Sequence, residues 1–148
     1  MVLRTVAGRR TGETADDLES WLVQLQGCPD ITRTVLASCA NESHGSEPAT
    51  WFYVEADPDE AVARHRCVSC GQSRHVLDSA DHWNFPHMWA CSHCSHSIAE
   101  LAAGLHVEGG DQVSWFALPA RCVDCGTIEG LTDFTIDPMP SDEVLRQL

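Results

Sequence analysis

Lysine is absent from this sequence, and all nine of its basic residues are arginine. Against 22 acidic residues, they leave a formal net charge of -13. Nucleic-acid binding needs a basic face that neutralises phosphates, so this charge disfavours a nucleic-acid partner. Acidity of this kind instead favours solubility or a basic protein partner.

Long apolar runs are also missing. No stretch reaches the length of about 18 apolar residues that predicts a membrane span, and residues 1–10 hold no apolar run of signal-peptide length. We therefore expect a cytoplasmic protein with no membrane segment. Because disulfides are rare in the cytoplasm, the eight cysteines indicate metal ligands before disulfides.

Familiar catalytic motifs do not occur. The sequence contains no phosphate-binding glycine loop, no Gly-x-Ser-x-Gly motif and no His-Glu-x-x-His motif. The zinc-deaminase signature is missing too. We therefore expect a protein without catalytic residues.

The length of 148 residues fits one domain, of the α+β class. We predict a flexible arm over residues 1–12 and an N-terminal helical segment over 13–47. A small β-rich zinc-knuckle core follows over 48–137, and 138–148 form a C-terminal tail. The helical segment holds two predicted helices, Thr14–Gln26 with apolar residues at helical spacing and Pro29–Ala40.

Within the core, aromatic and β-branched residues favour strands. Strands are predicted over residues 51–54, 61–68, 75–77, 87–90, 113–118 and 127–136. Ser97–His106 is predicted to be a helix, because its apolar residues recur at helical spacing.

Six cysteines form three Cys-x-x-Cys pairs, which we name knuckles. The first knuckle is Cys67/Cys70, the second is Cys91/Cys94 and the third is Cys122/Cys125. Two intervening residues make a tight turn that directs both sulfurs to one point, and two such turns complete a tetrahedral zinc site. Twenty residues separate the first and second knuckles, a spacing typical of zinc sites. We therefore predict that Cys67, Cys70, Cys91 and Cys94 share one zinc ion.

The third knuckle needs two further ligands. Cys28 and Cys39 would complete a second four-thiolate site. Alternatively, the first and third knuckles share a metal, and the second takes histidine or other ligands. An unpaired third knuckle could also act as a redox dithiol. The sequence leaves these alternatives open.

The segment Cys67-Val68-Ser69-Cys70-Gly71 resembles the zinc knuckle of zinc ribbons and treble-clef zinc fingers. The second knuckle, followed by the predicted helix over 97–106, is similar to the treble-clef second half. The resemblance covers about residues 61–106, with residues 121–126 as a further knuckle. It implies structural zinc and a role in binding proteins or nucleic acids. Two such knuckles resemble rubredoxin as well, which makes iron the alternative metal.

Two parts of the sequence resemble each other weakly, and we call this internal repeat the echo. Thr50-Trp51-Phe52 precedes Arg66-Cys67-Val68-Ser69-Cys70-Gly71, and Ser114-Trp115-Phe116 precedes Arg121-Cys122-Val123-Asp124-Cys125-Gly126. The order is the same, although the spacing differs. A duplicated unit and coincidence both explain it.

The function that we expect is that of a non-enzymatic zinc protein, acting as a protein-interaction module or accessory subunit. The alternatives are a redox or metal-handling protein and a transcription-associated zinc ribbon. Residues 83–86, Trp-Asn-Phe-Pro, connect the first two knuckles, and their rings would form a docking site if both are exposed.

Overall fold

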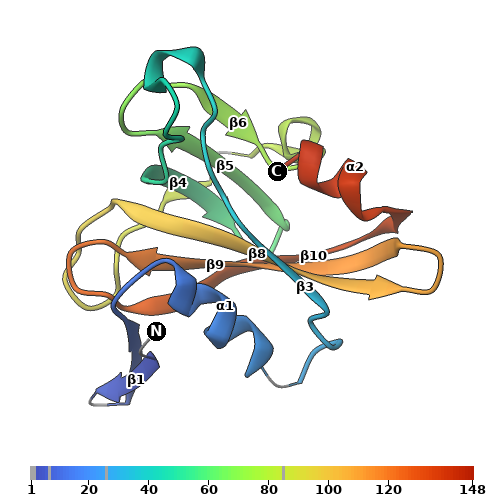
Figure 1. The fold of residues 1–148 in the computed structure, drawn as a ribbon, viewed down its shortest axis with the longest axis horizontal. Helices are drawn as coiled ribbons and strands as arrows, with labels where there is room; N and C mark the ends of the chain where they lie inside the picture. Colours follow the sequence, from blue (N-terminus) through green and yellow to red (C-terminus); the bar gives the residue numbers. More distant parts are fainter. Residues whose placement is uncertain (1–2, 7, 26, 85) are drawn as a thin grey trace.

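The computed structural model describes residues 3–6, 8–25, 27–84 and 86–148. Figure 1 shows its arrangement. The elements follow one another as β1 (Leu3–Val6), β2 (Arg9–Gly12), α1 (Asp16–Val23), β3 (Arg33–Leu36), the 3-10 helix η1 (Glu42–His44), β4 (Phe52–Asp57), β5 (Val62–Cys67), β6 (Ser73–His75), the 3-10 helix η2 (Ser79–His82), β7 (His87–Met88), β8 (Ala99–Glu108), β9 (Gln112–Cys122), β10 (Ile128–Pro140) and α2 (Ser141–Arg146).

One antiparallel β-sheet makes up most of the fold. Its strands follow the order β10-β9-β8-β4-β5-β6, while β3 pairs with β8 and β7 pairs with β4. The register joins β4 to β8 only between Phe52 and Ala99. The sheet therefore bends at this point, and β4–β6 lie across β8–β10 (Figure 1). Strands β1 and β2 form a separate hairpin.

The larger apolar core lies between the two halves of the bent sheet. Phe52 of β4 and Leu101 of β8 are among its fully buried side chains. The rings of Phe116 and Phe134 stack there with centroids 4.6 Å apart. Burial of large apolar side chains is the main favourable term in folding, so this core holds the halves together.

A smaller core lies on the opposite side of β8–β10, under α1. Leu18 and Leu22 of the helix are fully buried against β8–β10, where they join Trp115. The molecule therefore has three layers, with α1 on one side of β8–β10 and β4–β6 on the other, while β3 lies in the middle layer beside β8 (Figure 1).

The fold class predicted from the sequence, a small α+β zinc-knuckle domain with an N-terminal helical segment, is wrong. The described residues form an eight-stranded antiparallel sheet with a two-stranded hairpin, and α1 and α2 are short. Of the two helices predicted over 13–47, the first is α1. The second, predicted over Pro29–Ala40, is instead replaced by the strand β3, which pairs with β8.

The helix predicted over Ser97–His106 is also wrong, because this segment is the long strand β8. Leu101 and Leu105 face the larger core, whereas Ala102 faces α1. A strand buried on both faces carries no alternation of polar and apolar residues, so its pattern cannot be distinguished from that of a buried helix.

The other predicted strands are present with shifted ends. The arm expected over residues 1–12 contains the hairpin of β1 and β2, and the tail contains α2. The unit boundaries after residues 12, 47 and 137 stay a prediction. Among the described residues, no helix is long and apolar enough to cross a membrane.

Helix α1 packs closely on β8 at Gly104, and this contact generates a prediction. A Cβ atom at Gly104 would lie 2.6 Å from Cδ2 of Leu22 and 3.1 Å from Cδ1 of Ile31. Gly104→Val should lower the free energy of unfolding by about 2 kcal/mol through overpacking. Urea denaturation measures this change.

Gly109→Val is the control, because a Cβ atom there meets no atom within 4 Å. It should change the free energy of unfolding by less than about 0.5 kcal/mol. Equal effects of the two substitutions would contradict the close packing of α1 on β8.

Candidate metal centres

The three knuckles share one backbone geometry. In each, the amide of the first cysteine donates to the carbonyl five residues later, and its own carbonyl accepts from the amide four residues later. That fourth residue has a positive φ, which is 78° at Gly71, 66° at Ser95 and 78° at Gly126. Glycine adopts this conformation without steric cost, and Ser95 is the exception.

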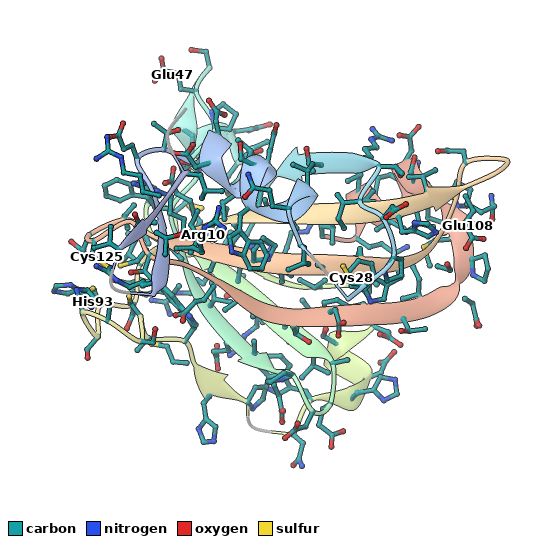
Figure 2. The ribbon with its side chains drawn as sticks, turned by 90° about the horizontal axis from the view of Figure 1, so that it is seen from below. Arg10, Cys28, Glu47, His93, Glu108 and Cys125 are labelled. Atoms are coloured by element: carbon teal, nitrogen blue, oxygen red, sulfur yellow. The ribbon has the colours of Figure 1, made fainter. Side chains whose placement is uncertain are left out.

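The second and third knuckles face each other and form the all-cysteine group, defined as Cys91, Cys94, Cys122 and Cys125. The Sγ atoms of Cys91 and Cys125 lie 3.5 Å apart, as do those of Cys94 and Cys122. In Figure 2, Cys125 lies at one end of the long sheet and Glu108 near the other. The group thus closes one end of the β8–β9 hairpin.

The first knuckle belongs to a different group, which contains one histidine. This mixed group consists of Cys39, His44, Cys67 and Cys70. The Sγ atoms of Cys39 and Cys70 are 3.7 Å apart, and Sγ of Cys67 lies 3.5 Å from Nε2 of His44. Cys39 is held by a backbone bridge to Ala49, and His44 lies in η1.

Both groups fit a tetrahedral metal ion. All ligand atoms within each group lie within 4.8 Å of one another. Zinc–sulfur bonds of about 2.3 Å place tetrahedral sulfurs about 3.8 Å apart, close to the separations seen here. The separations are too long for disulfide bonds, and all eight cysteines are free.

The structure groups the knuckles differently from the sequence prediction. It does not bring the first knuckle together with the second, nor with the third. Cys39 joins the first knuckle instead of the third. Cys28 belongs to neither group; it packs beside the smaller core under α1, well separated from Cys125 in Figure 2.

Sequence reasoning missed His44 as a ligand, because it lies in a polar loop without a Cys-x-x-Cys partner. One signal could have found it. Each of the two repeated Arg-Cys-Val-x-Cys-Gly segments supplies two ligands, so each would need two further ligands from earlier in the chain to complete a tetrahedral site. Cys39 and His44 precede the first copy as Cys91 and Cys94 precede the second.

The all-cysteine group has a cation and a hydroxyl as neighbours, whereas the mixed group has the amide oxygen of Gln72, 4.0 Å from Sγ of Cys39. Nη1 of Arg9 lies 3.8 Å from Sγ of Cys125 and donates to the hydroxyl of Thr127 at 2.5 Å. That hydroxyl is 3.1 Å from the same sulfur. The hairpin of β1 and β2 therefore brings a positive charge to the thiols.

The thiols of the all-cysteine group have unequal proton affinities. Burial acts to raise the pKa of Cys125, but hydrogen bonds from Thr127, Cys91 and Cys94 together outweigh it and bring this pKa to about 6. Burial is also the largest effect at Cys122, where it raises the pKa to about 12. Because metal ligands must be thiolates, metal uptake by this group releases protons.

The hairpins that carry the knuckles are equivalent as well. Phe52 pairs with Cys67 at the base of the β4–β5 hairpin, as Ala99 pairs with Cys122 in the β8–β9 hairpin. In each hairpin, the residue after the first knuckle cysteine donates its amide to the residue before the first strand, at 3.1 and 3.2 Å. We name the two units, each with its metal-ligand group, the N-terminal ribbon (β4–β6) and the C-terminal ribbon (β8–β10).

Only half of the sequence echo is structural. The two Arg-Cys-Val-x-Cys-Gly segments occupy equivalent places, but the aromatic segments do not. Phe52 begins the first strand of its hairpin and Trp51 lies just before it, whereas Trp115 lies on the second strand of its hairpin. Ile98 occupies the place that corresponds to Trp51.

Comparison of the chain with protein-family models, with curated proteins and with solved structures finds no match. The two groups that could hold a metal ion are compatible with the resemblance to zinc ribbons. The treble-clef form is not supported, because a strand and not a helix follows the second knuckle.

A prediction follows from the contact between β2 and the third knuckle. Gly71 and Gly126 have the same φ of 78°, but only at Gly126 would a Cβ atom meet an obstacle, the carbonyl oxygen of Gly12 at 2.6 Å. Gly71→Ala should cost about 1 kcal/mol of unfolding free energy through the left-handed backbone. Gly126→Ala should cost about 3 kcal/mol, because the clash adds to that strain.

Chemical denaturation of the metal-loaded proteins measures both costs. The two variants are each other's control, since they differ in the clash and not in the backbone conformation. Similar losses would show that β2 does not lie against the third knuckle.

Proposed function

We propose that this protein is a non-enzymatic cytoplasmic zinc protein. Two structural zinc ions hold its two ribbons, and the assembled body serves as a protein-interaction module or accessory subunit. The observation that carries this proposal is the convergence of eight potential ligands into two groups of four. The cytoplasm suits such ligands because it keeps thiols reduced.

A structural role is favoured by the number of ligands. Four protein ligands fill a tetrahedral zinc ion, so no position is left for water or a substrate. Each group contains a buried cysteine that begins a knuckle: Cys67 is 1% exposed in the mixed group, and Cys122 is 0% exposed in the all-cysteine group. The ions would fix the base of each hairpin, so that folding and metal binding are coupled.

Zinc is favoured over iron by the mixed donor set. One imidazole with three thiolates is a common structural zinc set, and thiolate groups also accept iron. The all-cysteine group alone would suit either metal. Zinc binds four thiolates, or three thiolates and one imidazole, in the same tetrahedral geometry, so one metal suits both groups.

The redox alternative loses support from the grouping. All three knuckles lie within the two potential metal sites, and Cys28 is the remaining cysteine. A redox dithiol needs two neighbouring free thiols, and a knuckle committed to a metal does not supply them. We therefore prefer the interaction role.

Metal analysis of the purified chain tests the proposal. We expect two zinc ions per chain by elemental analysis and native mass spectrometry. X-ray absorption at the zinc edge should give an average first shell of seven sulfurs and one nitrogen over the two ions, as the two ligand groups imply. This measurement needs no variant, so it does not depend on the folding of mutants.

Paired substitutions test which knuckles share an ion. Cys91→Ser with Cys122→Ser removes two ligands of one group, so one zinc should remain. Cys67→Ser with Cys91→Ser removes a ligand from each group, so both ions should be weakened or lost. Cys28→Ser is the control and should retain two.

A chain without metal, or one that carries iron with its visible thiolate absorption, would contradict the proposal. Retention of one tightly bound zinc by the Cys67/Cys91 double variant would show that these two residues share a site, as the sequence first suggested.

A further inference from the structure

The two ribbons pack through equivalent faces, so their outer faces are equivalent too. Phe52 and Ala99, at matching positions, both line the larger core. The residues beside them, Tyr53 and Glu100, therefore point away from that core. These outer faces differ in what covers them.

The outer face of the C-terminal ribbon is covered by the chain's own N-terminal segment. Arg121 lies there at 8% exposure, and its guanidinium forms an ion pair of 2.6 Å with Glu100. It also donates to the carbonyl oxygens of Gly12 and Glu13 at 2.8 and 2.7 Å. The arginine thus holds the backbone of the covering segment.

The covering segment also contacts the third knuckle directly. The amide of Gly12 donates to the carbonyl of Gly126 at 2.9 Å, and Thr11 forms an antiparallel bridge with Thr127. Thr127 and Ile128 are buried as a result, at 2% and 4% exposure.

On the N-terminal ribbon, the corresponding residues are exposed. Arg66 matches Arg121, because each precedes the first cysteine of its knuckle and pairs across the hairpin with Tyr53 and Glu100 respectively. Arg66 is exposed, and its guanidinium carbon lies 5.6 Å from the centroid of the Tyr53 ring. Among the described residues, no carboxylate forms an ion pair with it.

The rest of this outer face is partly apolar and is open beyond Arg64, whose guanidinium carbon lies 4.7 Å from the centroid of the Trp83 ring. Gly71, Gln72 and Ser73, which correspond to the buried residues 126–128, are exposed. Trp51 at 50% and Met88 at 58% are two of the most exposed large apolar side chains of the described residues. The C-terminal ribbon therefore shows the kind of cover that this face lacks.

We propose that the outer face of the N-terminal ribbon binds a polypeptide segment of a different protein. The segment brings a carboxylate or main-chain carbonyls to Arg66, and it places an apolar side chain on Trp51. At Arg66 it repeats the contacts that the carbonyl oxygens of Gly12 and Glu13 make with Arg121 on the C-terminal ribbon. This inference names the partner surface of the proposed interaction module, and it rests on that function.

Charge favours a segment of a different protein over a second copy of this chain and over a nucleic acid. Two copies of the chain, each with a formal net charge of -13, repel one another, which disfavours self-association. A nucleic acid meets the same overall repulsion, and Arg64 on this face is already ion-paired with Glu55. Arg66 remains as a local positive charge that suits one carboxylate.

Selection from a phage-displayed library of random 12-residue peptides, against the full-length zinc-loaded protein, tests the proposal. Enriched peptides are synthesised and their dissociation constants measured by calorimetry. Arg66→Gln and Trp51→Ala should each weaken binding about tenfold or more, as expected for central interface residues. Arg146→Gln and Val23→Ala, an exposed arginine and an exposed apolar residue elsewhere, are the matched controls.

Zinc content and circular dichroism of each variant show that it is folded. If peptides bind equally well to both test variants, or if no peptide is enriched over empty resin, the proposal is overturned. It is also overturned if Arg66→Gln abolishes a dimer seen by sedimentation, or abolishes binding of labelled single-stranded oligothymidine. Missing zinc would instead contradict the proposed function, so the two failures are distinguishable.

Discussion

Convergence of four ligands at the base of each β-hairpin is the constraint on which the rest of this structure depends. The knuckle turn fixes the register of the hairpin, because the cysteine that begins the knuckle is both a potential metal ligand and a strand residue. Cys67 pairs with Phe52 across one hairpin, and Cys122 pairs with Ala99 across the other. With that register set, residues of β4, β5, β8, β9 and β10 face the shared core. The larger core therefore forms between the two ribbons, and the metal-ligand groups lie at its margin.

The two ribbons are equivalent in their knuckles and hairpins but differ in what covers their outer faces. The C-terminal ribbon has long strands, one face in the larger core and the other under α1. The N-terminal ribbon has short strands and one face open. Arg121 and Arg66 show the difference most clearly, since one clamps the chain's own backbone and the other is exposed. The two ribbons thus share the arrangement of their potential metal ligands while their outer surfaces differ.

Local features of this protein could be predicted from the sequence, whereas the contacts between residues far apart in the chain could not. Three knuckles, α1 and most strands follow from spacing and residue type. The fold class did not, because β8 is buried on both faces, and its Leu101 and Leu105, with Ile98 just before the strand, mimic a helical stripe. The grouping of the knuckles could not be predicted either. The spacing between Cys70 and Cys91 is typical of a shared zinc site, yet the structure places these two residues in different groups. Apart from the repeated knuckle segment, His44 carried no signal of its own, and the structure places its Nε2 atom 3.5 Å from Sγ of Cys67.

The position of Arg9 has a consequence for the balance of charge between the two sites. A divalent ion with four thiolates carries two net negative charges, whereas three thiolates and a neutral imidazole leave one. The guanidinium near Cys125 offsets one unit of that excess. With a divalent ion in each group, the hairpin of β1 and β2 would supply a counterion, and the two chemically different sites would carry nearly the same net charge.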